Sequence, residues 1–286
     1  MSYILETRDL TQVYGAGTPF ERTALDHVNI QVEKGEILGV IGHTGSGKST
    51  LIQHFNGLLK PTSGEVLLSG HSIWDAKGKC DRKTRFAVGL VFQYPEYQLF
   101  EETIAKDIAF GPQNMGLSAT EVEKRVREAM DFVGLDPALA NHSPFALSGG
   151  QKRRVAIAGV IAMRPQVLIL DEPTVGLDPA GRDEILAQIQ DYHARSGATI
   201  LIVSHSMEDI ARMADRLLVM NRAHVMLCGT PREVFAHADE IVEAGLDIPE
   251  ITKVIRELNR RGIDLDPSIY TVEDAVRAIR AYKEGK

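Results

Sequence analysis

The phosphate-binding pattern GHTGSGKST, Gly42 to Thr50, is the feature that most constrains the fold of this chain. It follows the apolar segment Glu36 to Ile41, which we expect to form a buried strand, and it leads into a helix expected from about Gly47 to Leu58. The glycines of such a loop let backbone N–H groups surround phosphate oxygens, and the helix N-terminus favours the same negative charge. A strand, a glycine-rich turn and a helix in this order predict an α/β fold that binds a nucleotide.

The pattern G-x-x-x-x-G-K-[ST] assigns individual roles within this loop. Lys48 is expected to bridge the β- and γ-phosphates, and the hydroxyl of Ser49 is expected to ligate Mg²⁺. A chance match is the alternative, and the strand–turn–helix context makes it the weaker one. The residues expected to bind the nucleotide in this loop are Gly42, His43, Thr44, Gly45, Ser46, Gly47, Lys48, Ser49 and Thr50.

An acidic pair ends a second apolar strand, Leu168 to Glu172. Ligands of open α/β sheets lie beyond the carboxyl ends of the strands, so this pair is expected near the phosphate loop. Asp171 would then hold Mg²⁺ through a water molecule, and Glu172 would polarise the water that attacks the phosphate. A solvated pair of acids is the commoner arrangement at a strand end, but it is the weaker interpretation beside a phosphate loop.

The string LSGGQ precedes Asp171 by twenty residues and is expected to begin a helix. Ser148 is a good N-cap residue, and the two glycines after it expose backbone N–H groups at an anion-attracting helix start. This is a second anion site, separate from the phosphate loop. Taken alone, the same residues also fit an ordinary capped helix. The residues of this signature are Leu147, Ser148, Gly149, Gly150 and Gln151.

Strands and helices alternate along most of the chain. Short alternating segments around Tyr3 to Leu10 and Ala24 to Val32 predict antiparallel strands. Helical spacing fills Thr103 to Gly134, and from Ser148 on the strands and helices alternate as in a parallel sheet covered on both faces. After about Gly229 the strands stop, and short amphipathic helices follow, one of them starting near Thr271. Further strands are expected at residues 65–68, 88–93, 167–170, 199–203 and 216–220, and further helices at 148–163 and 179–194.

Composition excludes several classes of protein. The 286 residues suffice for one large α/β domain with an appendage, or for two modest domains. The net charge of −7 lacks the basic character of a duplex-binding protein. Cys80 and Cys228 lie in unrelated contexts, which argues against a disulfide scaffold or zinc site and suits a reducing cytosol. No apolar stretch is long enough to span a bilayer, and residues 1–10 lack the apolar segment of a signal peptide.

The order of the motifs resembles that of the ATPase domain of ATP-binding cassette (ABC) proteins. Along the chain come the phosphate loop, Gln93 after a strand, LSGGQ, LILDEP, and His205 after the strand Thr199 to Val203. The resemblance covers about Leu5 to Gly229. It implies that the nucleotide is ATP and that two such domains stack head to tail. LSGGQ of one domain would then close over ATP held by the phosphate loop of the other.

The ABC resemblance also assigns roles to residues that match the family motifs. Tyr14 resembles the aromatic residue that stacks on adenine, and Gln93 the Q-loop residue that senses Mg²⁺, the attacking water and the membrane partner. His205 resembles the switch histidine that contacts the γ-phosphate; taken singly, His205 and Tyr14 would more often be structural. The implied catalytic residues are Lys48, Gln93, Glu172 and His205, the metal ligands are Ser49, Gln93 and Asp171, and the D-loop residues are Gly176, Leu177 and Asp178.

The resemblance implies a particular α/β architecture. The ATPase domain, residues 1–229, would contain a mostly parallel core sheet, an antiparallel N-terminal β subdomain and a helical signature subdomain at about residues 94–164. Residues 230–286 would form a small helical C-terminal extension, which we expect to make a dimer contact.

Within the ABC proteins, the chain resembles the ATPases of energy-coupling factor (ECF) transporters of the second, A-prime type. The resemblance rests on the Q-loop segment Val88 to Leu117 with its string YPEYQLFEET, on the insert Thr18 to Arg22 and on the extension Leu246 to Gly262. It implies an ATP-hydrolysing motor subunit, peripheral on the cytoplasmic face of the cell membrane, for import of vitamins or related micronutrients. The implied partners are a related ATPase in a heterodimer, a membrane T subunit and, indirectly, a substrate-binding S subunit, with no nucleic acid.

A group of acids follows the Q-loop. In the ECF family the helix after the Q-loop receives arginines from coupling helices of the T subunit, and opposite charges near a partly buried contact would favour such docking. A solvated acidic face is the alternative. The acids expected to couple to the T subunit are Glu96, Glu101, Glu102 and Asp107.

Other ABC functions are alternatives to this one. An ATPase of another importer type, such as a cobalt, nickel or amino-acid system, would carry the same core motifs. A non-transport ABC ATPase acting on nucleic acid or ribosomes usually has a long coiled-coil insertion or two tandem domains, whereas this chain has one phosphate loop and no long heptad pattern. The sequence does not identify the transported substrate, nor whether the chain forms a homodimer.

Overall fold

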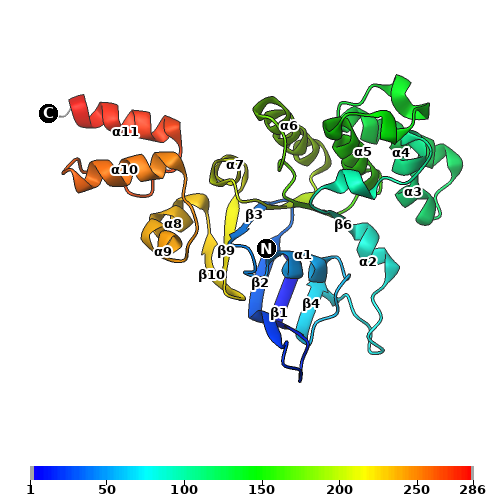
Figure 1. The fold of residues 1–286 in the computed structure, drawn as a ribbon, viewed down its shortest axis with the longest axis horizontal. Coiled ribbons are helices and arrows are strands. Elements are labelled where there is room, and N and C mark those ends of the chain that lie inside the picture. The colour runs from blue at the N-terminus through cyan, green and yellow to red at the C-terminus, as the bar shows by residue number, and fades with distance from the viewer. Residues whose placement is uncertain (1–2, 285–286) are drawn as a thin grey trace.

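The computed structural model describes residues 3–284, which form two β-sheets flanked by helices (Figure 1). One sheet has the strand order β2-β1-β4-β5, and the other has the order β10-β9-β3-β8-β7-β6. The strands are β1 Tyr3–Tyr14, β2 Arg22–Glu33, β3 Ile37–Gly42, β4 Ser63–Leu68, β5 His71–Ser72, β6 Val88–Val91, β7 Val167–Asp171, β8 Thr199–Val203, β9 Arg216–Asn221 and β10 His224–Gly229.

The six-stranded sheet is parallel except at one edge, where β10 runs antiparallel to β9. Successive side chains of a strand point to opposite faces of the sheet, and in the parallel strands of this sheet both sets are buried. In β7, for example, Leu168 and Leu170 join one core cluster while Val167 and Ile169 join the other. The mostly parallel core sheet expected from the sequence is therefore confirmed.

The smaller sheet is antiparallel and packs against the face of the core sheet that carries Val167 and Ile169 of β7. β1 pairs with both β2 and β4, and its register places Tyr14 opposite Arg22. Leu5, Leu10 and Leu25 from this sheet are fully buried in the same cluster as Phe55 of helix α1, Lys48–Phe55. This confirms the antiparallel N-terminal β subdomain.

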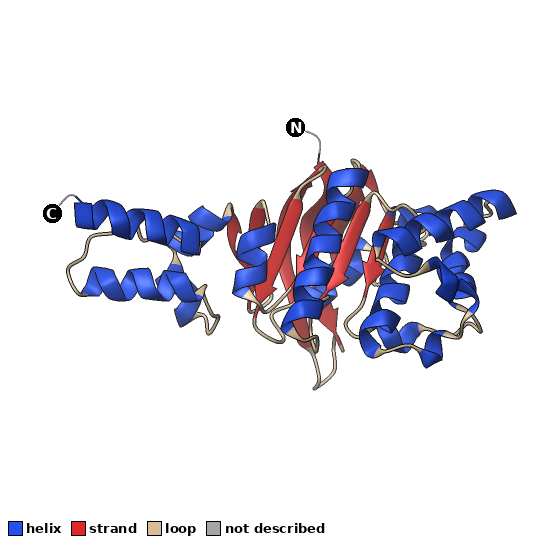
Figure 2. Ribbon diagram, turned by 90° about the horizontal axis from the view of Figure 1, so that it is seen from above, coloured by secondary structure: helices blue, strands red, loops and turns tan. Residues whose placement is uncertain are grey.

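Helices cover the other face of the core sheet and extend beyond the sheet at both of its ends (Figure 2). Helices α3, α4 and α5 pack together, with the 3-10 turns η1 Pro95–Gln98, η2 Pro137–Asn141 and η3 Pro144–Ala146 between or beside them. The helices are α1 Lys48–Phe55, α2 Arg82–Ala87, α3 Ile104–Asn114, α4 Ala119–Phe132, α5 Gly149–Ile161, α6 Pro179–Ser196, α7 Met207–Met213, α8 Pro231–Ala236, α9 Ala238–Glu243, α10 Glu250–Arg260 and α11 Val272–Glu284.

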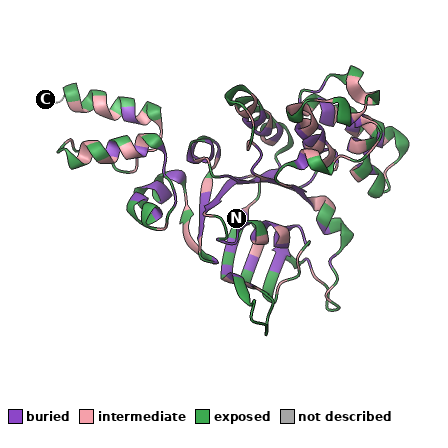
Figure 3. Ribbon diagram, in the orientation of Figure 1, coloured by how far each residue is buried: buried purple, intermediate pink, exposed green. Residues whose placement is uncertain are grey.

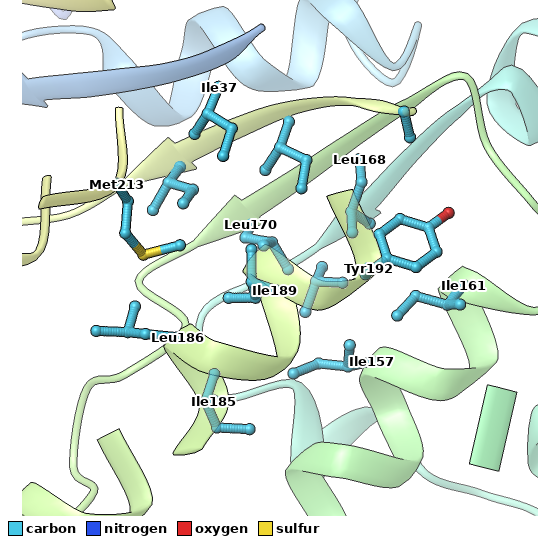
Figure 4. Packing of buried hydrophobic residues seen from close by; sticks show 14 of the residues in the cluster. Ile37, Ile157, Ile161, Leu168, Leu170, Ile185, Leu186, Ile189, Tyr192 and Met213 are labelled. Carbon is cyan, nitrogen blue, oxygen red and sulfur yellow. The ribbon is translucent and has the colours of Figure 1, made fainter. Parts of the chain in front are cut away.

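The main core lies between β7 and helices α5 and α6. Leu168 and Leu170 point toward Ile157 of α5 and toward Ile185 and Ile189 of α6 (Figure 4). These side chains are at most 4% exposed, and each contributes roughly 1.5–3 kcal/mol to folding through burial. Burial is densest in this central region, and exposed residues dominate the outer helices (Figure 3). The core fixes β7, and with it the acidic pair at its carboxyl end.

The C-terminal helices fall into two groups. Phe235 of α8 and Ile241 of α9 are fully buried in the main core cluster. Helices α10 and α11 form their own small cluster around Ile255 and Ala275, at the opposite end of the molecule from α3–α5 (Figure 1). The domain boundary at residue 229 stays a prediction, since α8 and α9 pack with the ATPase core.

Several element boundaries differ from the sequence-based expectations. Helix α1 ends at Phe55 instead of Leu58, because Gly57 adopts a left-handed conformation with φ 72°. Strand β10 and helix α2 were not expected. The predicted helix start near Thr271 is confirmed, since the Thr271 hydroxyl accepts a hydrogen bond from the Asp274 N–H at 3.2 Å. No helix within residues 3–284 is long and apolar enough to cross a membrane.

Candidate nucleotide-binding site

A cleft of about 380 Å³ lies at the carboxyl ends of the core strands, between the phosphate loop and the small sheet. This is where ligands of open α/β sheets bind. Most of the residues expected at the nucleotide come together here. The expected residues that line the cleft are Tyr14, Thr44, Gly45, Gly47, Lys48, Ser49, Thr50, Gln93, Asp171, Glu172 and His205.

The phosphate loop curves around the start of helix α1. Gly47 precedes the helix with φ 109°, and no side chain caps the first turn. The ammonium group of Lys48 is buried inside the loop, where it donates to the carbonyl oxygens of Gly42 at 2.5 Å and His43 at 3.1 Å. Burial lowers the pKa of Lys48, and the charges of Glu172 and Asp171 oppose this shift. The uncapped N–H groups and this buried cation favour an anion at the same point.

Glu172 is the strongly perturbed acid of the cleft. Burial raises its pKa to about 7, while a hydrogen bond from the His205 N–H acts in the opposite direction. Its Oε1 lies 3.3 Å from Nε2 of His205 and has no hydrogen-bond partner among the described residues. Its backbone has φ 51°, a strained conformation for a non-glycine residue. A strained, buried carboxylate that titrates near neutrality suits a general base.

His205 lies at the exposed side of this pair. It follows β8, whose carboxyl end is adjacent to that of β7 in the sheet. Its side chain is 56% exposed, and burial of its remaining surface lowers its pKa, with the charge of Lys48 acting in the same direction. A neutral, half-exposed imidazole can donate a hydrogen bond to a phosphate that enters the cleft.

Three oxygen donors in the cleft suit a magnesium ion. Ser49, Gln93 and Asp171 line the cleft and supply a hydroxyl, an amide and a carboxylate. Burial raises the pKa of Asp171, and the charge of Lys48 lowers it, so this carboxylate benefits from a nearby cation. No group of three or more His, Cys, Asp or Glu within residues 3–284 could hold a metal ion. Such a donor set fits Mg²⁺, which is commonly bound by few protein ligands together with substrate phosphates and water.

Tyr14 and Arg22 form the wall of the cleft on the side of the small sheet. Tyr14 is 40% exposed, and its hydroxyl lies 3.4 Å from the hydroxyl of Thr50. Arg22 donates to the Gly45 carbonyl at 3.4 Å, although no nucleotide motif contains it. The pairing of strands β1 and β2 could have indicated Arg22 as a cleft residue, since Arg22 is the strand partner of Tyr14. Ala24 and Val203 also line the cleft outside the motifs.

The remaining phosphate-loop residues lie behind the cleft. Position 42 requires glycine, because a Cβ there would lie 2.5 Å from the Met220 carbonyl oxygen. The His43 ring lies 3.0 Å from the Asn221 side chain, away from the cleft. Ser46 is fully buried. These three residues shape the loop from the inside.

The signature and the D-loop do not line the cleft of their own chain. Ser148 caps α5 as expected: its hydroxyl accepts from the Gln151 N–H at 3.3 Å, and the Gln151 side chain accepts from the Ser148 N–H at 3.1 Å. Asp178 caps α6 by accepting from the Gly181 N–H at 2.7 Å. Leu147 and Leu177 pack against the main core. Gly149, Gly150 and Gly176 have open space where a Cβ would lie.

The four acids after the Q-loop have different environments. Glu96 forms a bidentate ion pair with the buried Arg153. Asp107 accepts from the backbone N–H groups of Phe100 and Glu101 at 3.3 and 3.0 Å. Glu102 is 82% exposed and pairs with Lys106 at 2.6 Å. Glu101 is half-buried, so among these four acids Glu102 is the one with a largely exposed carboxylate.

A groove of about 480 Å³ lies next to these acids. Phe100 and Phe110 form one side with an edge-to-face contact, their ring centres 4.9 Å apart, and both side chains are about half exposed. Arg82 and Phe86 from α2 form another part of the lining. The α2 contribution was missed because a helix of six residues carries little periodic signal.

Comparisons with known proteins agree with these motifs. A sequence profile described as ABC transporter matches residues 25–175. The energy-coupling factor transporter ATP-binding protein EcfA2 of Caldanaerobacter subterraneus subsp. tengcongensis is 53% identical over 281 residues, which cover 98% of this chain and 98% of the relative. The protein of the same name from Clostridium perfringens is 54% identical over 276 residues, covering 96% of each chain.

Solved structures are similar as well. The structure of cbiO1 from Clostridium perfringens, described as part of the ABC transporter complex cbiONQ, has a TM-score of 0.75 and 40% identity, and the match covers 91% of this chain and 96% of that one. The ATP-binding cassette MJ0796, in a dimeric post-hydrolysis state with ADP and Pi, has a TM-score of 0.69 and 28% identity, covering 79% of this chain and 98% of that one.

Proposed function

The chain belongs to the ABC transporter family and, within it, to the energy-coupling factor transporter ATP-binding proteins, and from this premise we propose that it is one half of a composite ATPase. It binds ATP, and its ATP hydrolysis is coupled to transport. The other half would be a second ATP-binding subunit, stacked head to tail. Each phosphate loop would then hold ATP that the partner's signature helix covers.

The observation that carries this proposal is the environment of the signature glycines. A Cβ at Gly149 or Gly150 would meet no atom within 4 Å, so neither packing nor a close backbone approach inside the chain requires glycine there. The N–H groups at this helix start attract anions, yet they lie outside the cleft that contains Lys48. A phosphate brought by a second chain accounts for both facts.

The proposed reaction is an attack of water on the γ-phosphorus, with ADP leaving. Glu172 would take the proton from the attacking water, for which a pKa of about 7 is well matched at neutral pH. Lys48 would offset charge on the β- and γ-phosphates, and His205 would donate to the γ-phosphate. Tyr14 would stack on adenine. When bound, Mg²⁺ would supply further positive charge at the phosphates, held by Ser49, Gln93 and Asp171.

The proposed membrane partner is a T subunit that docks in the groove beside α3. The groove offers apolar surface from Phe100 and Phe110 and lies next to the half-buried Glu101 and the exposed carboxylate of Glu102. A basic, amphipathic segment of a membrane protein complements both features. The chain would then be peripheral on the cytoplasmic face of the membrane, and an S subunit bound to the T subunit would bring a vitamin or related micronutrient.

Purification of the tagged chain from native membranes tests the assembly. Mass spectrometry is expected to identify a second ATP-binding subunit, a membrane T subunit and S subunits, and vesicles containing this complex are expected to take up a micronutrient only when ATP and Mg²⁺ are supplied. Removal of Mg²⁺ with EDTA should stop hydrolysis. A chain that co-purifies with ribosomes or DNA, or only with copies of itself, would contradict the proposal.

A further inference from the structure

Arg153 joins three functional segments of the chain through one buried side chain. It lies on α5, two residues after the signature, and its side chain is 3% exposed. Its Nε and Nη2 donate to the two carboxylate oxygens of Glu96 at 3.2 and 3.1 Å. Its Nη1 donates to the carbonyl oxygens of Pro173 and Val175 at 3.2 and 2.6 Å.

Each partner of Arg153 is close in sequence to a residue of the site. Glu96 follows Gln93 by three residues, and Pro173 follows Glu172 directly. Val175 directly precedes the D-loop residues 176–178. The Q-loop and the segment that carries the general base follow the paired strands β6 and β7, and the Arg153 side chain connects both of them to the signature helix.

The backbone beside these contacts is strained. Tyr94, two residues before Glu96, has φ 55°, and Glu172, one residue before Pro173, has φ 51°. Left-handed conformations of non-glycine residues persist only where the surroundings hold them. A buried guanidinium that is bidentate on one side and donates to two carbonyls on the other is a rigid connection of the kind required, and only an arginine fork has this geometry.

We propose that Arg153 is a positioning residue, which sets Glu172 and the D-loop relative to the Q-loop. Docking of a membrane partner at the groove beside the Q-loop, as in the proposed function on which this inference rests, reaches the general base through the ion pair of Glu96 and Arg153. Glu96 thus transmits coupling inside the chain, whereas Glu101 and Glu102 present charge to the partner.

The test compares Arg153→Lys with Arg154→Lys in the assembled transporter. Lysine keeps the charge but cannot donate to a carboxylate and two carbonyls at once. Arg153→Lys is expected to lower kcat for ATP hydrolysis at least tenfold, with the KM for ATP within twofold of the parent value. Arg154 is the matched control, since its one ion pair within residues 3–284 is with the half-exposed Glu184, and its lysine variant should retain full activity.

Glu96→Gln provides a second, milder variant, which keeps the volume and one acceptor oxygen of the side chain. It is expected to lower kcat in the same way and to add little to Arg153→Lys in the double variant, because both changes break one connection. Equal losses for Arg153→Lys and Arg154→Lys, an effect on KM alone, or additive losses in the double variant would overturn the inference. Co-purification of the parent subunits is measured first, so a failure of assembly is recognised separately.

Discussion

The N-termini of helices α1 and α5 both attract anions, but they differ in their caps and in the space around their glycines. At α1, Gly47 has φ 109° and lacks a side-chain cap, and a Cβ there would lie 2.4 Å from the Ala24 carbonyl oxygen. At α5, Ser148 and Gln151 form a complete capping box, and the two glycines between them have open space where a Cβ would lie. The first start is enclosed by its own chain, and the second is an exposed surface.

This difference separates two reasons for a glycine. At Gly47 the backbone conformation and the close Ala24 carbonyl require it, whatever the protein binds. At Gly149 and Gly150 nothing in the chain requires it, and alanine would favour the helix by up to about 1 kcal/mol per residue. The α1 start is thus a site that the chain completes alone, while the α5 start gains its purpose from a ligand outside the chain.

The largest effect is expected from removing the general base beside the α1 start. Glu172→Gln keeps the shape of the side chain but cannot accept a proton, so ATP turnover of the assembled complex should fall by about 10²–10⁴-fold. ATP binding should persist, and the dimer should remain closed around it. Phosphate release and size-exclusion chromatography with ATP measure the two effects. Normal turnover would show that the base is a different residue.

A pair of glycine substitutions tests the comparison directly. Gly47→Ala should abolish ATP binding and lower Tm, because it forces a Cβ into the Ala24 carbonyl at a left-handed φ. Gly150→Ala should leave Tm and ATP binding to the single chain unchanged, yet lower turnover of the complex about tenfold or more, a loss of roughly 1.4 kcal/mol or more in transition-state stabilisation.

Calorimetry with ATP, thermal melting and phosphate release distinguish these outcomes. The two variants make the same chemical change at the two helix starts, so each serves as the control for the other. If Gly150→Ala lowered Tm as Gly47→Ala does, the signature glycines would be structural, and the contrast between the two starts would be wrong.

The sequence predicted residues whose role depends on local order along the chain. The phosphate loop, the acids after β7 and the histidine after β8 all follow parallel core strands, and carboxyl ends of such strands meet at one edge. The alternation of strands with helices along the chain likewise predicted a sheet covered on both faces, and the continuous apolar run of β7 is buried in this way. In such cases the fold converts sequence position directly into spatial position.

Residues whose role depends on a distant partner could not be predicted in this way. Glu96 looks like a surface acid in a polar segment, but it pairs with Arg153, which is 57 positions away in the chain. Strand β10 was missed because it is an edge strand with only partly buried residues, so its apolar pattern is weak. Tertiary packing, which no local pattern encodes, decides both cases.

A smaller effect is expected at the groove beside α3, a third surface that needs a partner. Replacing Glu101 and Glu102 together by lysine should reduce ATP-driven uptake in vesicles several-fold, since a rim charge of the wrong sign opposes docking. ATP binding by the separate chain and its Tm should stay unchanged. The control with the same change of charge is Glu123→Lys with Asp191→Lys, at exposed sites on α4 and α6. Equal uptake by both double variants would place the docking surface elsewhere.

The smallest effect is expected on the thermal stability of the chain. A substitution at Glu172, beside the α1 start, should change Tm in a pH-dependent way, whereas a substitution at the α5 start should change Tm equally at every pH. The pKa of Glu172 is about 7 in the folded chain against an ordinary value of 4.5, so the folded state binds more protons between these values and loses stability as the pH rises through them. Glu172→Gln removes this cost, so it should raise Tm at pH 8 and leave it unchanged near pH 4.5.

After allowance for solvent screening the gain is about 1 kcal/mol, which corresponds to roughly 2–4 °C. Ser148→Ala provides the contrast at the α5 start, because it removes an uncharged cap and should cost about 1 kcal/mol at every pH. Thermal melts of both variants at pH 5 and pH 8 check these signs. A gain for Glu172→Gln that did not depend on pH would mean that this carboxyl has the same pKa in the folded and the unfolded chain, and Glu172 would then lack the raised pKa of a base matched to neutral pH.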